Sequence, residues 1–164
     1  MSTRCMVLVA ETYDDGSKFI PLYRHSDGYP LGAGSTILEA LDKAPVDAES
    51  LLAILLAERY TFESGLVGRD GGPVHRAATW QPEEQGDLEY VYVIKPAARG
   101  PSIGARSGVA AWTVTIHERG SFANQVEDWR KWGNLTYTRE QLEDRLKIEQ
   151  AAYDARLAAR QRSA

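Results

Sequence analysis

Four short segments of the chain predict β-strands, two because they are rich in Val, Leu, Ile, Phe and Tyr and two because large apolar residues recur at every second position. The first two segments, Arg4–Glu11 and Lys18–His25, flank an Asp-Gly pair in Asp14–Ser17 that suits a tight turn. The other two are Leu88–Lys95 and Ala110–Glu118. We therefore expect two antiparallel strand pairs, one near the N-terminus and one in the second half of the chain.

Two details predict where these strands lie in a sheet. In Leu88–Lys95, Val91 and Val93 make the second face of the strand apolar as well, which is typical of a strand in the middle of a sheet. Pro21 removes a backbone donor from Lys18–His25. That strand is therefore expected at an edge of the sheet, or with a local irregularity.

A period of about 3.6 residues predicts helices between the two strand pairs. Ser35 is expected to cap a helix that runs to about Lys43, and Pro45 should end it. Asp47 is expected to cap a second helix that runs to about Tyr60. Two apolar helices in this position could cover one face of the sheet.

A third helix is predicted from the capping box Thr138–Gln141 to about Ala159. Its apolar stripe consists of Leu142, Leu146, Tyr153 and Leu157. Glu149 interrupts this stripe, and its steps do not alternate between three and four residues as a coiled-coil seam requires. We therefore expect the helix to dock on its own domain through the segment Trp129–Trp132, which lies in a predicted short helical turn, Val126–Trp132. This favours a monomer, with a homodimer through the helix as the alternative.

Together these elements predict an α+β fold, with an antiparallel β-sheet covered on one face by helices and a long C-terminal helix. Residues 1–137 should form the α+β domain, and residues 138–164 the helix docked on it. The glycine- and proline-rich segments 61–85 and 96–108 are predicted to be loops.

Composition narrows the class of protein. With 43% hydrophobic and 26% charged residues over 164 positions, the chain is typical of a single folded domain rather than a disordered segment. Its longest apolar run, Leu51–Ala57, is too short to cross a bilayer, and no signal peptide is predicted. The single cysteine, Cys5, excludes an internal disulfide and is consistent with the cytoplasm. A net charge of −4 argues against a dedicated nucleic-acid binder.

Metal and cofactor sites find little support. The three histidines, His25, His75 and His117, match no ligand spacing, and no phosphate-binding glycine motif is present. We therefore expect no metal and no cofactor. Arg130–Trp132 mixes charge with an aromatic ring as a nucleic-acid groove would, but packing of the tryptophans is the favoured interpretation.

The densest group of polar and turn-forming residues is the segment Tyr23–Pro30. Arg24 could hold a phosphate or carboxylate, and His25 could exchange a proton near neutral pH with Asp27 to orient it. The alternative is structural, with Asp27 and its glycine forming a tight turn and Arg24 paired to an acidic neighbour. Together with Tyr29, these residues form the candidate binding site.

The same segment is part of a wider pattern that is similar to a known protein family. An N-terminal Thr-Arg strand, the pattern Tyr-x-His-x-Asp-Gly-Tyr-Pro ending at Pro30, the glycines of Gly32–Gly34 and the later Tyr90-Val91-Tyr92 strand resemble a family of small bacteriophage and prophage proteins. The resemblance covers residues 1–60 well and 88–118 loosely. Many members have an aromatic residue where this chain has Ser26. The resemblance implies a phage-type origin, hence a host cytoplasm, and no reaction.

Two functions remain open from the sequence. The first is a non-enzymatic binding protein of phage or prophage type that engages a host or defence-system protein, such as an anti-CRISPR-like factor. The second is a small hydrolase or transferase acting on a phosphate-bearing ligand, with His25 as acid and base, Asp27 orienting it and Arg24 binding the anion.

Overall fold

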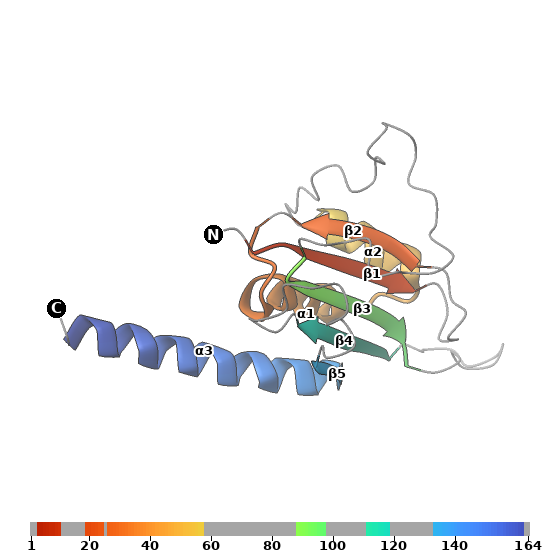
Figure 1. Cartoon of the computed structure of the whole chain (residues 1–164). Helices are drawn as coiled ribbons and strands as arrows, with labels where there is room; N and C mark the ends of the chain where they lie inside the picture. Colours follow the sequence, from red (N-terminus) through yellow and green to blue (C-terminus); the bar gives the residue numbers. More distant parts are fainter. Residues whose placement is uncertain are drawn as a thin grey trace.

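The structure of the protein is a computed structural model (Figure 1). It describes residues 3–10, 19–24, 26–57, 88–97, 111–118 and 133–162. The predicted turn at Asp14–Ser17, the segment Val126–Trp132 and most of the two predicted loops lie outside these residues.

In the described part of the chain, five strands form one sheet in the order β2-β1-β3-β4-β5. The strands are β1 (Cys5–Ala10), β2 (Phe19–Arg24), β3 (Tyr90–Pro96), β4 (Trp112–Glu118) and β5 (Gly133–Thr138). The predicted antiparallel pairs β1–β2 and β3–β4 are confirmed, and so are the central position of β3 and the edge position of β2.

The sheet is mixed rather than purely antiparallel, because β1 and β3 pair in parallel. A parallel pair needs a long crossover, and the chain between β2 and β3 supplies one that contains two helices. The edge strand β5, antiparallel to β4, was not predicted from the sequence. The α+β class itself is confirmed.

Within the described ranges, the sheet is accompanied by three α-helices: α1 (Ser35–Asp42), α2 (Ala48–Ala57) and α3 (Arg139–Arg162). The Asp47 cap is confirmed, since its carboxylate accepts a hydrogen bond of 2.7 Å from the Ser50 amide. At the start of α3, the Gln141 side chain accepts a 2.9 Å hydrogen bond from the Thr138 amide, so the predicted capping box forms.

The prediction that Ser35 caps α1 is wrong. A π-helical turn, η1 (Pro30–Gly34), precedes α1, and its helical backbone runs on through Gly34 into Ser35. The Ser35 hydroxyl therefore donates to the Leu31 carbonyl, four residues back, instead of accepting from a helix amide. Pro30 starts the helical backbone because its fixed φ suits the first helical turn.

The helices cover one face of the sheet, and Figure 1 shows α1 and α2 behind it. The main apolar core lies between this face and the helices, and it includes Val7, Tyr92 and Ile116. The opposite face carries a second buried cluster, to which Val91 and Val93 belong, as their alternation predicted. Both faces of the central strand β3 are therefore buried.

Helix α3 is docked only at its beginning. Leu142 and Leu146 are buried, and the helix contacts η1, α1, β4 and β5. Residues 151–162 are all exposed, and in Figure 1 this half of α3 projects beyond the sheet. In the described part of the chain, no helix is both long and apolar enough to cross a membrane.

Candidate binding groove

The turn that follows β2 is fastened to the sheet. The Gly28 amide donates to the Thr3 carbonyl at 2.9 Å, and the buried Tyr92 hydroxyl donates to the Gly28 carbonyl at 2.8 Å. A Cβ atom on Gly28 would lie 2.8 Å from the Cβ of Cys5, so only glycine fits against β1 here. Asp27 has a φ of 54°, a left-handed conformation that aspartate tolerates in turns. The Asp-Gly pair thus forms a rigid structural turn.

Arg24 holds this turn from the β2 side. Its Nε donates to the Ser26 carbonyl at 2.7 Å, and its Nη1 donates to the Thr36 hydroxyl at 3.3 Å. Its Nη2 lies 3.9 Å from an Asp27 carboxylate oxygen. The Arg24 side chain is only 14% exposed. These contacts hold the Arg24 side chain against the turn.

The next glycines allow close packing behind the turn. A Cβ on Gly32 would overlap the Asp27 carbonyl oxygen. A Cβ on Gly34 would lie 3.3 Å from the Leu146 side chain, so Gly34 lets α3 approach η1 closely. The glycines of this segment therefore shape the turn and seat α3 beside it.

The predicted site residues fall into different places. His25 lies outside the described residues. The Asp27 side chain is exposed at the surface of the turn. Tyr29 is 40% exposed and lines a groove, whereas Arg24 and Asp27, the other predicted residues that the structure describes, do not line it. The prediction of a binding site on this segment stays a prediction.

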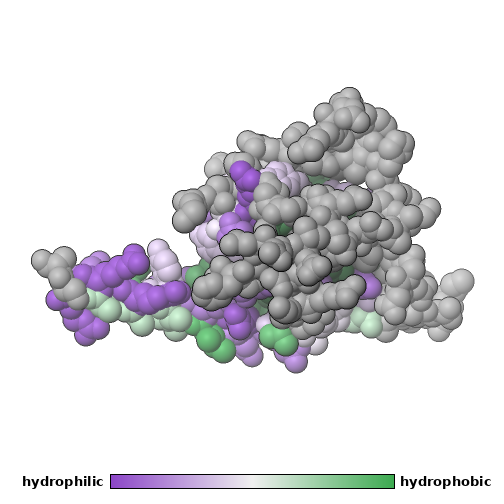
Figure 2. Space-filling view, viewed as in Figure 1, coloured by the Kyte–Doolittle hydropathy of each residue, from purple (hydrophilic) through white to green (hydrophobic). Residues whose placement is uncertain are grey.

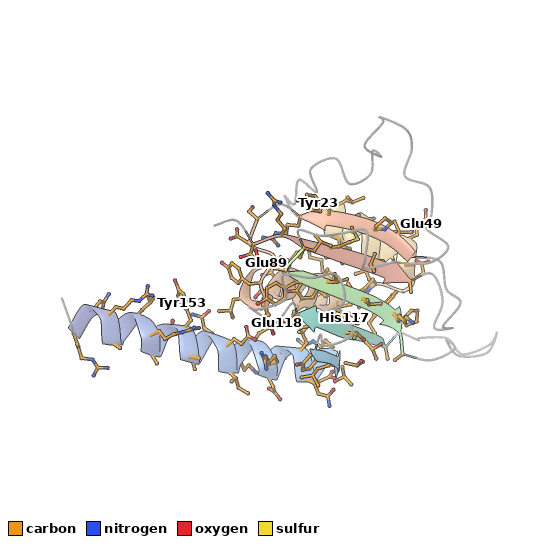
Figure 3. All side chains as sticks on the ribbon, in the orientation of Figure 1. Tyr23, Glu49, Glu89, His117, Glu118 and Tyr153 are labelled. Carbon is orange, nitrogen blue, oxygen red and sulfur yellow. The ribbon has the colours of Figure 1, made fainter. Side chains whose placement is uncertain are left out.

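The groove has a volume of about 690 Å³ and lies between the turn, the sheet and α3. Its walls come from Tyr29, Pro30 and Leu31 of the turn and η1, from Tyr90 and Glu118 at the ends of β3 and β4, and from Arg145, Glu149, Gln150, Ala152, Tyr153 and Arg156 of α3. Figure 3 labels Tyr153 on α3 and Glu118 at the end of β4. The parallel start of β3 beside β1 brings Tyr90 next to the turn.

Most polar groups in the groove are already held in place. Arg145 donates from Nε and Nη2 to one Glu149 oxygen, both at 2.6 Å. The Tyr90 hydroxyl donates to Glu118 at 3.1 Å. Burial, and then the negative charge of Glu118, raise the pKa of Tyr90, so it stays a neutral donor at physiological pH.

Arg156 differs from Arg145. Its Nε donates to the Ala152 carbonyl at 3.2 Å, and among the described residues it forms no ion pair with a carboxylate. The groove therefore presents three tyrosine rings, a neutralised Arg145–Glu149 pair, a carboxylate at Glu118 and a guanidinium at Arg156 that is open to a ligand.

The described residues also include a cysteine and a histidine that do not line the groove. Within the described ranges, no three His, Cys, Asp or Glu side chains stand close enough to hold a metal ion. Burial raises the pKa of the Cys5 thiol to about 12, which leaves it protonated and unreactive. His117 lies on the opposite face of the sheet beside Val91, and burial lowers its pKa.

Sequence reasoning missed most of this groove. Tyr153 was placed in the buried stripe of the third helix, yet it is 47% exposed and lines the groove. The sequence marks Tyr90 only as part of a strand and does not mark Arg145, because only the fold brings the two residues together. No protein-family model, no curated protein and no solved structure matches this chain.

Proposed function

We propose that this chain is a non-enzymatic binding protein whose recognition surface is the groove between the turn, the sheet and α3. The observation that carries the proposal is the convergence of Tyr29, Tyr90 and Tyr153 with Arg145 and Arg156 on one concave surface. Tyrosine and arginine are the residues most enriched at the energetic centres of protein interfaces.

The contacts and the exposure of the groove side chains support the same function. The Arg145–Glu149 and Tyr90–Glu118 contacts are formed without a partner, so little side-chain freedom is lost when one binds. Tyr29 and Tyr153 remain about half exposed, and Arg156 has no carboxylate partner among the described residues. A protein segment with an apolar or aromatic anchor and a carboxylate fits these free groups.

The resemblance of residues 1–60 to small phage and prophage proteins supports a host protein as the partner. On this basis the occupant is a host or defence-system protein, and the chain is a host-interaction or anti-defence factor, anti-CRISPR-like in its mode of action. A groove formed jointly by the family-like turn and by α3 suits recognition of one protein surface.

The alternative, a hydrolase or transferase acting on a phosphate-bearing ligand, requires a free Arg24. The contacts of Arg24 with Ser26, Thr36 and Asp27 weigh against it, because an anion would have to compete with all three. We therefore propose that the groove recognises the partner and that Arg24 has a structural role.

Affinity capture with matched variants tests the proposal. The immobilised full chain is expected to retain a specific host protein from a lysate, and Tyr29→Ala and Tyr153→Ala should each weaken binding of the purified protein by about tenfold or more. Val46→Ala is the control, since Val46 is 64% exposed and does not line the groove. Equal binding by all the variants, or an equal loss with Val46→Ala, would contradict the proposal.

A further inference from the structure

One face of α3 remains uncovered along most of its length. Leu142 and Leu146 turn toward the body of the protein and are buried. Ile148, by contrast, is 67% exposed, and the alanines that follow it on the same face are exposed as well. Figure 2 shows this face as a green to pale-green band along α3, opposite a purple hydrophilic side.

A line of six residues runs along the centre of the outward face: Asp144, Ile148, Ala151, Ala155, Ala158 and Arg162. The steps between them alternate regularly between four and three residues. This is the spacing of a coiled-coil seam, which keeps one stripe of a helix facing a partner helix. The buried stripe through Leu142 lacks this alternation, and it docks on the protein's own domain instead.

The positions of the seam are also symmetric about its centre. Asp144 and Arg162, Ile148 and Ala158, and Ala151 and Ala155 are three pairs equally distant from position 153. In an antiparallel pair of identical helices centred there, each residue of the seam meets its counterpart in the partner helix. The seam ends with a carboxylate opposite a guanidinium, and a large side chain opposes a small one inside it.

We infer that α3 pairs with α3 of a second copy of this chain, antiparallel and centred near position 153. Small residues at Ala151, Ala155 and Ala158 let the two helices approach closely, while Ile148 of each copy packs over Ala158 of the other. Asp144 and Arg162 form ion pairs at both ends of the seam. The occupant of the outward face is thus a second copy, held by a contact that is the same on both protomers.

The charges of α3 support this pairing. In the docked half, Arg139, Arg145 and Lys147 each form an ion pair with a carboxylate of the same chain. In the projecting half, Arg162 has no such ion pair among the described residues, and its Nε donates to the Ala158 carbonyl of its own helix. Asp144 has only a long contact of 3.7 Å with Lys147. Each copy therefore offers an acidic and a basic end to the other.

The fold leaves room for the partner helix. The body packs on the side of α3 that carries Leu142 and Leu146, and the seam lies on the opposite side. In an antiparallel pair, the two bodies lie on opposite sides of the helix pair and at opposite ends. Each dimer then presents two grooves, which permits bivalent binding. The pairing does not depend on what the grooves bind.

Sedimentation equilibrium of the full chain, from roughly 5 to 300 µM, tests the inference. A monomer–dimer equilibrium is expected, and Ala155→Glu should abolish it by placing a charge in the seam. Ala53→Glu is the matched control, because Ala53 is also an exposed alanine within a helix. A chain that stays monomeric at every concentration, or a dimer that tolerates Ala155→Glu, would overturn the inference.

Charge reversal tests the register. Asp144→Arg and Arg162→Asp should each raise the dimer dissociation constant by about tenfold, since each turns two attractive pairs into two repulsive ones. The double variant restores opposite charges at both ends and should return the dissociation constant close to that of the natural chain. Additive losses in the double variant would overturn the antiparallel register.

Discussion

Tyr92→Phe removes a single hydroxyl from the contact that fastens the turn beneath the groove. In the folded chain, this hydroxyl donates a 2.8 Å hydrogen bond to the Gly28 carbonyl, and the tyrosine side chain is fully buried. Phenylalanine keeps the ring, so packing in the core is nearly unchanged. The effect of the substitution therefore measures the polar contact itself.

The expected loss of stability in Tyr92→Phe follows from the burial of this hydrogen bond. Removing one partner of a buried hydrogen bond loses the bond and leaves the other partner without that donor, which costs about 1–3 kcal/mol. With a urea dependence of about 2 kcal/mol/M, the midpoint of unfolding should fall by roughly 0.5–1.5 M. Tyr153→Phe is the control, because Tyr153 is about half exposed and should change stability by no more than about 0.5 kcal/mol.

Urea titration at 25 °C, followed by far-ultraviolet circular dichroism, compares the natural chain with both variants. If Tyr92→Phe unfolds at the same midpoint as Tyr153→Phe, the contact between β3 and the turn does not stabilise the protein. The position of Tyr29 in the groove would then need another explanation.

Three further outcomes are expected. Gly28→Ala should destabilise the protein by about 1–3 kcal/mol in urea titrations, because the new methyl group meets Cys5 at 2.8 Å; a midpoint like that of the natural chain would contradict this. Contacts with Lys147 and Arg139 lower the pKa of Glu143 below its ordinary 4.5, so its contribution is present above that pH and is lost as the pH falls through the folded-state pKa. Urea midpoints at pH 7 and pH 3 should therefore differ less for Glu143→Gln than for the natural chain, and an unchanged difference would refute the assignment. Cys5 should react with a thiol reagent only when the protein unfolds, since it is buried and its pKa is about 12; rapid labelling of the native chain would contradict this.

The elements predicted from the sequence are those with a strong period. Alternation in Leu88–Lys95 and Ala110–Glu118 predicted two adjacent strands, and Pro21 correctly predicted an edge strand. The strand β5 was missed because it begins with glycine and asparagine and has only Leu135 and Tyr137 as large apolar residues. The parallel pairing of β1 with β3 joins segments about 85 residues apart. A sequence pattern within a single strand cannot predict such a distant contact.

The site was only partly predictable for the same reason. The turn chemistry around Asp27 could be inferred locally, because an Asp-Gly pair favours a left-handed conformation wherever it occurs. The groove depends on three segments that meet only in the fold, so neither Tyr90 nor Arg145 stood out. Tyr153 continued an apolar stripe in sequence, but α3 leaves the body before that stripe is fully covered.

Photo-cross-linking from inside the groove tests most directly whether it is the recognition surface. With p-benzoylphenylalanine replacing Tyr153 in one sample and Val46 in another, the chain is irradiated in a host lysate. We predict one specific covalent adduct from position 153 and none from position 46, which lies on the exposed connection before α2. Adducts from position 46 alone, or the same adducts from both positions, would contradict a recognition surface in the groove.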